Sequence, residues 1–500
     1  MTISYATLDS VTDPASQPPP GAGSADPGLD ADDLVAATDG RLLTRSARTV
    51  LGAAVDSREV IRDNLFVALP GERTDGHAFV ADAIARGAAA ILVSRSADGL
   101  DGLDGRDFDA ADVTVIRVAD TLPAFQRIAA AWRTRFDPLV VGVTGSIAKT
   151  STKEAIATVL ASELVTLKNE GNKNNEIGLP LTVMRLRHDH QAAVLEMGMY
   201  VGGEIAELAR IGRPEIGVVT AVQPVHLSRI GTIEAVERAK GELVEALPAD
   251  GVAVLNADDE RVRRMADRTA ARVVLYGFAS DAAVRAEDVE SAGTDGMRFS
   301  LVADGARRPV AIPTLGRLAV HNALAAAAVG LASGIAPERV AAALAVGWSA
   351  PHRGALVRAG GLTIVDDSYN ASPASVIAAL DILAGMPGRR VAVLGEMLEL
   401  GDGAEAGHER VGVAAAAVAQ LLVVVGAGAA GIARGARDAG LAADRIVEVP
   451  DRNAGLAALE RLGKSGDVVL VKASRGIELD RLVDALTDAA AAGRFADGAR

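Results

Sequence analysis

Short runs of aliphatic residues recur along the chain, and the longer segments between them carry an apolar residue at every third or fourth position. The runs are typical of strands buried on both faces, and the spaced segments are typical of amphipathic helices. Their alternation predicts mostly parallel sheets in an α/β fold. Strands are predicted at residues 64–69, 89–93, 139–144, 192–196, 216–220, 252–255, 273–276, 363–365, 391–394, 421–425 and 468–471. Helices are predicted at residues 77–86, 152–160, 232–247, 321–333, 373–383, 409–418, 429–438 and 477–489.

The same patterns divide the chain into four segments. Residues 1–29 are rich in Pro, Gly, Ser and Asp, which predicts a disordered leader. Residues 30–135 are predicted to form a small N-terminal α/β domain. Residues 136–348 are predicted to form a central domain with a β-rich excursion at 280–313, and residues 349–500 a third α/β domain.

Composition narrows the class of protein. Of the 500 residues 49% are hydrophobic, which is enough for several globular cores. The net charge of −14 argues against non-specific binding of nucleic acid. The absence of cysteine excludes disulfides and cysteine catalysis. Because no run of about 18 apolar residues and no signal-peptide pattern occur, we expect no membrane insertion and a cytoplasmic location.

A phosphate-binding loop is predicted where the strand at 139–144 meets the next helix. Backbone N–H groups of a small-residue turn, with the start of a helix, attract phosphate oxygens. A lysine after the turn reaches the β- and γ-phosphates of a nucleotide, and the next hydroxyl ligates Mg²⁺. The segment comprises Gly145, Ser146, Ile147, Ala148, Lys149, Thr150 and Ser151.

Ala148 departs from this pattern, because such loops usually carry glycine before the lysine. Glycine allows close approach of the backbone and any φ angle. An alanine is tolerable there if its φ stays negative and costly if φ is positive.

Four further polar groups follow predicted strands or lie on helices of the central domain. Glu196 ends one strand and His226 follows another, so both belong to the edge of the sheet where ligands bind. Asn172 and Asn175 lie in an Asn-rich loop that suits polar ligand atoms, although turns also favour asparagine. Lys240 lies in a predicted helix. From the pattern alone, the default interpretation is a solvated group for Glu196, a structurally paired group for His226 and an exposed helix lysine for Lys240.

Ten motifs in register resemble the Mur ligases. Among them are G-S-x-x-K-T-S, G-N-x-N-N-E-I-G-L-P-L-T, E-M-G, R-A-K-G-E-L, D-D-S-Y-N-A-S-P and V-L-V-K-A-S-R, together covering residues 55–486. The pattern is most similar to the branch that joins D-alanyl-D-alanine to UDP-N-acetylmuramoyl-tripeptide. The resemblance implies a central P-loop domain between an N-terminal nucleotide-sugar domain and a C-terminal Rossmann-like domain. It also implies that ATP converts a carboxylate into an acyl phosphate, from which an amine displaces phosphate.

The resemblance assigns roles to individual residues. It implies two Mg²⁺ ions, held by Thr150, Glu196, His226 and Lys240, with Lys240 modified by CO₂ to a carbamate. Nucleotide contacts are implied for Lys149 and for Asn322, Arg353, Asp367 and Asn370. Substrate contacts are implied for Ser57, Arg58, Lys472, Ser474 and Arg475. The expected partners are these small molecules only, and the expected state is a monomer.

Two more departures from the family pattern leave alternatives open. Leu318 and Ala319 stand where the family often has His-Asn, and His352 stands where it usually has Gly. The chain could therefore be an amide ligase for another acid and amine, or a nucleotide-binding partner protein without turnover. The nucleotide-sugar motif at Asp56 to Arg58 disfavours the first of these.

Overall fold

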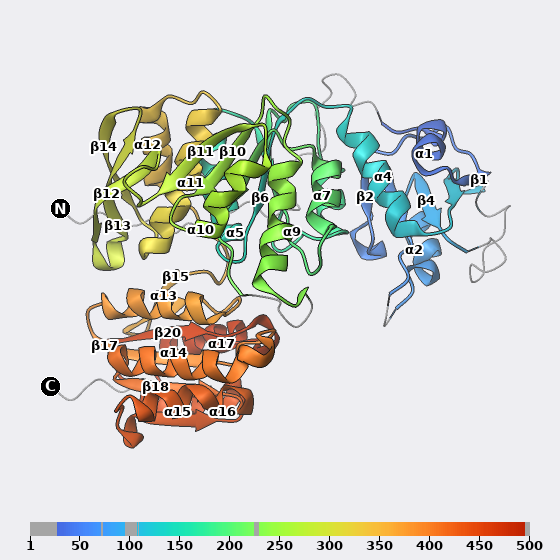
Figure 1. Cartoon of the computed structure of the whole chain (residues 1–500). Coiled ribbons are helices and arrows are strands. Elements are labelled where there is room, and N and C mark those ends of the chain that lie inside the picture. The colour runs from blue at the N-terminus through green and yellow to red at the C-terminus, as the bar shows by residue number, and fades with distance from the viewer. Residues whose placement is uncertain (1–27, 72–73, 96–107, 109, 225–229, 496–500) are drawn as a thin grey trace. The chain divides into compact units, whose positions relative to one another are not determined.

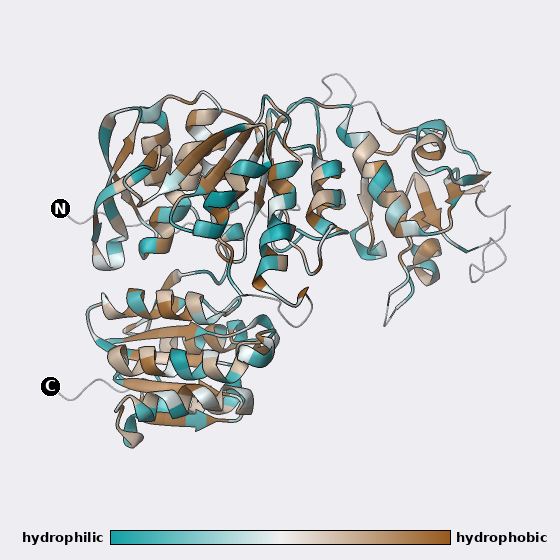
Figure 2. Ribbon diagram, in the orientation of Figure 1, coloured by the Kyte–Doolittle hydropathy of each residue, from teal (hydrophilic) through white to brown (hydrophobic). Residues whose placement is uncertain are grey.

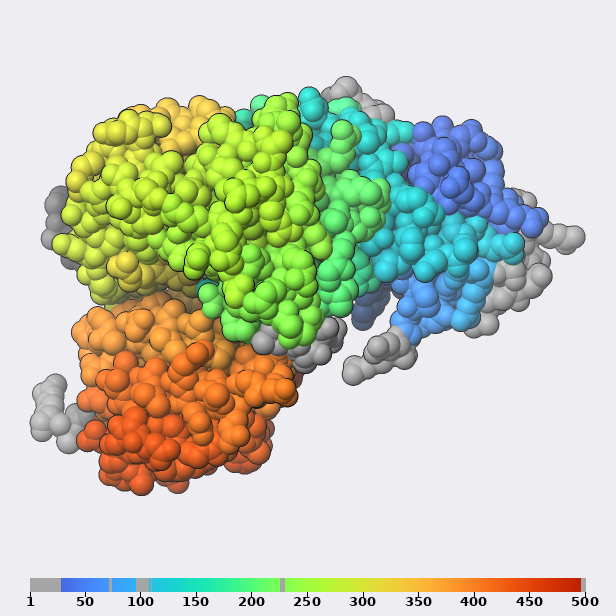
Figure 3. Space-filling view, in the orientation of Figure 1, coloured from blue at the N-terminus to red at the C-terminus, as the bar shows by residue number. Residues whose placement is uncertain are grey.

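The computed structural model describes residues 28–71, 74–95, 108, 110–224 and 230–495, so residues 1–27 of the predicted leader and His226 lie outside the described residues. Leu29, the last residue of the predicted leader, is buried and pairs with Val50, so it belongs to the first folded unit. The chain divides into two compact units, Met1–Ala119 and Asp120–Arg500. Figure 3 colours the surface of the chain in sequence order, from blue at the N-terminus to red at the C-terminus. The three-domain α/β class predicted from the sequence is confirmed.

The first unit is built on a five-stranded sheet in the order β1-β5-β4-β3-β2. Only β1 runs antiparallel to its neighbour; the other three pairings are parallel. Side chains from β3, β4 and α2, including Phe66, Ile91 and Val80, form one core. The elements are α1 (Ala31–Thr38), β1 (Arg41–Thr44), β2 (Gly52–Ala54), η2 (Ser57–Glu59), β3 (Asn64–Val67), η3 (Gly76–Phe79), α2 (Val80–Ala85), β4 (Ala90–Val93) and β5 (Thr114–Arg117).

The second unit begins with a nine-stranded sheet in the order β14-β13-β12-β11-β10-β9-β6-β8-β7. Figure 1 labels β6 and β10 to β14 of this sheet. Its strands are β6 (Leu139–Thr144), β7 (Thr166–Lys168), β8 (Ala192–Glu196), β9 (Ile216–Val219), β10 (Val252–Asn256), β11 (Arg272–Gly277), β12 (Val284–Ser291), β13 (Met297–Ala303) and β14 (Ala306–Ile312). The strands from β7 to β12 pair in parallel, whereas β12, β13 and β14 pair antiparallel. These last three strands are the predicted β-rich excursion.

Helices cover both faces of this sheet. Side chains of α5, α11 and α12 form one core with the strands, including Ile156, Leu324 and Leu344. On the opposite face, Leu243 of α9 lies where a side chain at Gly142 or Gly217 would point. The helices are α4 (Thr121–Arg133), α5 (Lys149–Ala161), α6 (Gly178–Val183), α7 (Glu204–Gly212), α9 (Ile233–Glu245), α10 (Glu260–Arg263), η5 (Arg264–Arg268), η6 (Gly293–Asp295), α11 (Arg317–Ala332) and α12 (Pro337–Val346).

The rest of the second unit is a six-stranded sheet in the order β15-β16-β20-β17-β18-β19, with only β15 antiparallel. Its apolar strands, brown in Figure 2, form one core with α13, α14 and α15 and another with α16 and α17. The strands are β15 (Ala355–Ala359), β16 (Leu362–Asp366), β17 (Arg389–Gly395), β18 (Leu421–Val425), β19 (Ile446–Val449) and β20 (Asp467–Lys472). The helices are α13 (Pro373–Ala384), η7 (Gly401–Gly403), α14 (Ala404–Val418), η8 (Ala427–Ala429), α15 (Ala430–Asp438), η9 (Ala443–Arg445), α16 (Arg452–Leu462), η10 (Arg475–Ile477) and α17 (Asp480–Ala491).

The predicted strands are all present, with ends shifted by at most two residues. Several elements that the pattern did not predict are short or rich in polar residues, such as β1, β15 and α16. The helix after the phosphate loop begins at Lys149, three residues before the predicted start. No helix in the described part of the chain is long and apolar enough to span a bilayer.

Candidate active site

The predicted phosphate loop lies between β6 and α5 and is fixed to the end of β9. Gly145 has a φ of 149°, and a Cβ atom there would lie 1.9 Å from the Thr220 hydroxyl oxygen, so this position requires glycine. Thr220 Oγ1 donates to the Ile147 carbonyl at 2.6 Å. Ser146 Oγ donates to the Gln223 carbonyl at 3.1 Å and accepts its N–H at 2.9 Å. The loop is therefore held in shape before any ligand binds.

Ala148 caps the N-terminus of α5 in the left-handed region, with a φ of 64°. An L-residue with a side chain is strained there, because its Cβ approaches the following carbonyl oxygen. The structure therefore has the positive φ that the sequence analysis expected to be costly for an alanine at this position.

Replacing Ala148 with glycine is expected to increase the free energy of unfolding by up to about 1 kcal/mol. The relief of about 1–2 kcal/mol of strain exceeds the extra backbone entropy of glycine in the unfolded chain, about 0.4–1 kcal/mol. Chemical denaturation checks this. Ala342 is the matched control, since it is exposed within α12 and Ala342→Gly should lower stability by about 1 kcal/mol. Equal losses in the two variants would contradict the strain.

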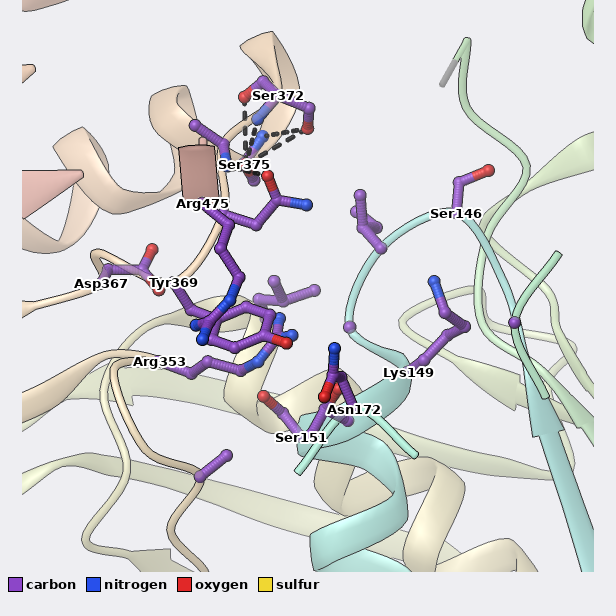
Figure 4. Close-up of a pocket in the computed structure, with 18 of the residues that line it drawn as sticks. Ser146, Lys149, Ser151, Asn172, Arg353, Asp367, Tyr369, Ser372, Ser375 and Arg475 are labelled. Atoms are coloured by element: carbon purple, nitrogen blue, oxygen red, sulfur yellow. Dashed lines mark hydrogen bonds between the residues drawn. The ribbon is translucent and has the colours of Figure 1, made fainter. Parts of the chain in front are cut away.

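Lys149 extends from the loop toward the cavity (Figure 4). Its ammonium makes no hydrogen bond or ion pair with a described residue. Burial lowers the pKa of Lys149, and nearby Arg353 lowers it further, against the opposing effect of Glu196. A lysine without a partner among the described residues, at the N-terminus of a helix, favours binding of an anionic ligand.

Glu196 ends β8 and is buried, with 1% of its surface exposed. Its Oε1 accepts hydrogen bonds from Thr150 Oγ1 at 3.2 Å and from Asn174 Nδ2 at 2.6 Å. Its Oε2 is buried without a hydrogen-bond partner among the described residues. Such an oxygen is costly unless another group satisfies it.

The Asn-rich loop holds Glu196 in place, but through other residues than those the sequence singled out. Asn169 accepts the Glu196 N–H at 2.7 Å and donates to its carbonyl at 3.1 Å. The fully buried ammonium of Lys153 in turn donates to the Asn169 carbonyl at 2.6 Å. Asn172 and Asn175 line the cavity, and Asn175 Oδ1 also accepts the Gly178 N–H at 2.9 Å, which fixes the start of α6. Loop composition alone could not say which asparagine faces which group.

Lys240 lies on α9 with 2% of its surface exposed and lines the same cavity. The reading of Lys240 as an exposed helix lysine is therefore wrong. Burial, with a smaller effect of Lys149, holds the pKa of Lys240 well below the ordinary lysine value. No described residue makes an ion pair or hydrogen bond with its side chain.

One feature of the site suits a Mg²⁺ ion. The Glu196 Oε2 atom has no partner among the described residues, and the Thr150 hydroxyl lies beside the same carboxylate. Mg²⁺ prefers oxygen ligands and commonly binds one or two carboxylates together with phosphate oxygens. No group of three or more His, Asp or Glu side chains in the described part of the chain is placed to hold a metal ion. Protein ligands beyond Glu196 and Thr150 would have to come from His226, which lies outside that part, or from a modified Lys240.

The C-terminal sheet supplies the opposite wall of a cavity of about 420 Å³. Arg353, Tyr369 and Arg475 face the phosphate loop across it (Figure 4). Lys472 is buried and pairs with Asp367 at 2.6 Å, and its ammonium donates to the Asn370 carbonyl at 2.8 Å. These three predicted ligand contacts therefore bind one another and shape the wall.

Ser474 and His352 also hold this wall together. Ser474 Oγ accepts the Leu398 N–H at 2.9 Å. His352 has a φ of 59°, the conformation for which the family's glycine is suited, and its Nδ1 lies 2.7 Å from Asp366 Oδ2. Its carbonyl accepts the Tyr369 N–H at 3.1 Å. The imidazole contact compensates in part for the strained backbone.

A second cavity of about 520 Å³ shares Ile147 and Ala148 of the phosphate loop with the first. Asn322 lines both cavities and accepts a hydrogen bond from Thr152 Oγ1 at 3.0 Å. His321, which lies 2.9 Å from Asp258, lines the second cavity but was not singled out from the sequence. Leu318, which with Ala319 stands where the family often has His-Asn, lines both cavities.

Ser57 and Arg58 belong to the first unit. Ser57 is buried, whereas the Arg58 side chain is exposed and forms a two-bond ion pair with Asp56. Hydrogen bonds from Arg58 lower the pKa of Asp56 to about 2.

A phosphate loop at the end of a parallel sheet, opposite a second α/β domain, defines a P-loop nucleotide-binding protein. Three family models of the Mur ligases match the chain: the catalytic domain at residues 49–133, the middle domain at 143–330 and the glutamate ligase domain at 352–475. The chain belongs to the Mur ligase family.

Several relatives of this chain share one name. The UDP-N-acetylmuramoyl-tripeptide–D-alanyl-D-alanine ligase of Bacillus subtilis is 36% identical over 87% of this chain and 93% of its own length. A MurF crystal structure from Acinetobacter baumannii matches with a TM-score of 0.82 and 27% identity, over 93% of this chain and 99% of its own. The MurF ligase of Thermotoga maritima in complex with ADP matches with a TM-score of 0.76 and 27% identity, over 88% and 97%.

Proposed function

We propose that this chain joins D-alanyl-D-alanine to UDP-N-acetylmuramoyl-tripeptide at the expense of ATP, in the synthesis of peptidoglycan precursors. The observation that carries the proposal is the cavity in which Lys149 and the phosphate loop face an unsatisfied buried carboxylate, Glu196. The names of the relatives, at 36% identity and more over most of the chain, supply the substrates. The complex of the Thermotoga maritima relative with ADP supports ATP as the nucleotide.

The chemistry proceeds in two displacements. A carboxylate oxygen of the tripeptide attacks the γ-phosphorus of ATP, the bond to the β-phosphate oxygen breaks, and ADP leaves. The free amine of the dipeptide then attacks the acyl carbon, a proton is lost, and inorganic phosphate leaves with the former carboxylate oxygen. Transfer of this kind depends on positioning and charge neutralisation. Lys149 and the N–H groups of the loop would hold the β- and γ-phosphates in line with the acceptor.

Mg²⁺ would supply charge neutralisation on the phosphate oxygens. We propose two ions, held by Thr150, Glu196, His226 and the carbamate of Lys240. The neutral amine that carbamate formation requires is favoured by the lowered pKa of Lys240. The modification would convert a buried amine without a described partner into a carboxylate, in a part of the chain where no group of three or more His, Asp or Glu side chains among the described residues could hold a metal ion.

Most of the remaining contacts with nucleotide and substrate are assigned to residues that line the two cavities. The nucleoside would occupy the second cavity beside Asn322, while Asp367 and Asn370 would close over the nucleotide from the opposite wall. Arg353 would contact phosphate. Asn172, Asn175, Lys472, Ser474 and Arg475 would surround the tripeptide end and the incoming dipeptide, either directly or by shaping the wall. Ser57 and Arg58 would bind the UDP-sugar in the first unit.

Domain roles and cellular state belong to the same proposal. Residues 30–135 would bind the nucleotide sugar, 136–348 ATP, and 349–500 the dipeptide. The chain would act as a monomer in the cytoplasm.

Phosphate release with each reactant omitted in turn tests the proposed function. With ATP, Mg²⁺, UDP-N-acetylmuramoyl-tripeptide and D-alanyl-D-alanine all present, we expect release of phosphate and a UDP-linked pentapeptide by mass. Each omission should reduce release to background. Release that does not need the dipeptide, or that is supported only by another amine, would contradict the proposal.

A further inference from the structure

Two arginines of the cavity wall lie against one aromatic ring. The guanidinium carbon of Arg353 is 4.2 Å from the centroid of Tyr369, and that of Arg475 is 4.7 Å from it (Figure 4). The three residues come from separate segments: the turn before β15, the loop after β16 and the 3₁₀ turn after β20. All three line the cavity that contains Lys149.

Neither arginine has a carboxylate partner among the described residues. Arg389, in the same sheet, shows the contrasting arrangement, because it donates two hydrogen bonds to the buried Asp467. An arginine neutralised by a carboxylate presents no net charge to a ligand. An arginine held on a ring face keeps its charge and its in-plane N–H donors.

Tyr369 is suited to hold both side chains. Two like charges near each other repel, and each long side chain loses rotamer freedom when it is fixed. Attraction to the electron-rich ring offsets both costs. The Tyr369 hydroxyl makes no hydrogen bond with a described residue, so its contacts with the two arginines are made through the ring. The ring itself is anchored by the Tyr369 N–H, which donates to the His352 carbonyl at 3.1 Å.

We propose that Tyr369 is a positioning residue that holds the guanidinium groups of Arg353 and Arg475 ready for substrate oxyanions. The bidentate N–H pattern of arginine matches a carboxylate or a phosphoryl group. In this protein the first source is the carboxylate of the incoming dipeptide and the second is the nucleotide. The identity of these two sources rests on the proposed function, whereas the arrangement of the ring and the two guanidinium groups does not.

Tyr369→Leu removes the ring, and Tyr369→Phe keeps it without the hydroxyl. In Tyr369→Leu we expect the Kd for ADP, the KM for D-alanyl-D-alanine, or both, to rise about tenfold, while kcat stays within about threefold. Tyr369→Phe should restore both constants to within about threefold of wild type. Thermal melting of the two variants should agree with that of wild type, because Tyr369 is only partly buried.

The Kd for ADP and the KM for the dipeptide together show whether the arginines bind phosphate or the dipeptide carboxylate. A rise in the ADP Kd alone, measured by calorimetry, would assign the pair to phosphate. A rise in the dipeptide KM alone would assign it to the carboxylate, and D-alanyl-D-alanine carboxamide should then show no further rise in Tyr369→Leu.

Three results would overturn the proposal: both constants unchanged in Tyr369→Leu, a loss of kcat without a change in either constant, or equal damage in Tyr369→Phe. Should wild type lack ligase turnover, the proposed function fails, and the ADP arm alone decides the role of Tyr369. An unchanged ADP Kd would then overturn that role.

Discussion

Replacing Glu196 with glutamine is expected to lower ligase turnover about a thousandfold, the scale on which preorganised charge contributes to catalysis. The substitution keeps the acceptor for Thr150 and Asn174 but replaces the unsatisfied anionic oxygen with an amide. Without metal, the variant should melt at the same temperature as wild type or higher, because it no longer buries an unpaired charge. We expect Mg²⁺ with nucleotide to raise the melting temperature of wild type, and this rise should be absent in the variant.

Asp467 provides the matched control for Glu196. It is equally buried, but both of its oxygens accept hydrogen bonds from Arg389. Asp467→Asn should therefore lower the melting temperature and leave the response to Mg²⁺ and nucleotide intact. A Glu196→Gln variant that turns over at the wild-type rate, or that keeps the Mg²⁺ response, would contradict the role of this carboxylate.

Two buried lysines are expected to respond in opposite ways to substitution by methionine. Lys240 has no described partner, so Lys240→Met should increase the free energy of unfolding by about 1 kcal/mol or more in buffer free of metal and bicarbonate. Lys153→Met should decrease it by about 1–3 kcal/mol, because the Asn169 carbonyl loses its donor. Lys240→Met should nonetheless abolish ligase turnover.

The pH dependence gives the Lys240 prediction its sign. Because the pKa of folded Lys240 is lowered, the unfolded chain binds more protons between that pKa and the ordinary value of 10.5. Wild type should therefore gain stability relative to Lys240→Met as pH rises toward 10.5. Chemical denaturation at pH 7 and pH 9.5 measures the difference. A constant difference between the two pH values, or destabilisation by Lys240→Met at pH 7, would contradict a buried and unpaired amine.

The parallel sheets and the phosphate loop could be predicted from the sequence because their signals are local. Runs such as 139–144 and 421–425 are strongly apolar, and small residues followed by Lys149 between a strand and a helix are typical of a phosphate-binding loop. The β-hairpins near residues 290–312 were anticipated only as a β-rich segment, because their exposed faces carry polar side chains.

The details of the site could not be predicted because they depend on tertiary contacts. Lys153 and Lys240 both lie in helical patterns, and only packing shows that both are buried and that one alone has partners. The sign of φ at Ala148 depends on how β9 fixes the loop. The contacts of Tyr369 could not be predicted, because Arg353 and Arg475 lie in other segments of the sequence and meet its ring only in the folded structure.

Transfer of an ¹⁸O label from the substrate carboxylate tests the central claim most directly. The tripeptide would be labelled in the carboxyl group that becomes the amide, and inorganic phosphate from the complete reaction would be analysed by mass. Activation as an acyl phosphate predicts one ¹⁸O atom in each phosphate released, together with an amide that retains the other. Phosphate without label would mean that water cleaves ATP and that this cavity does not activate the carboxylate.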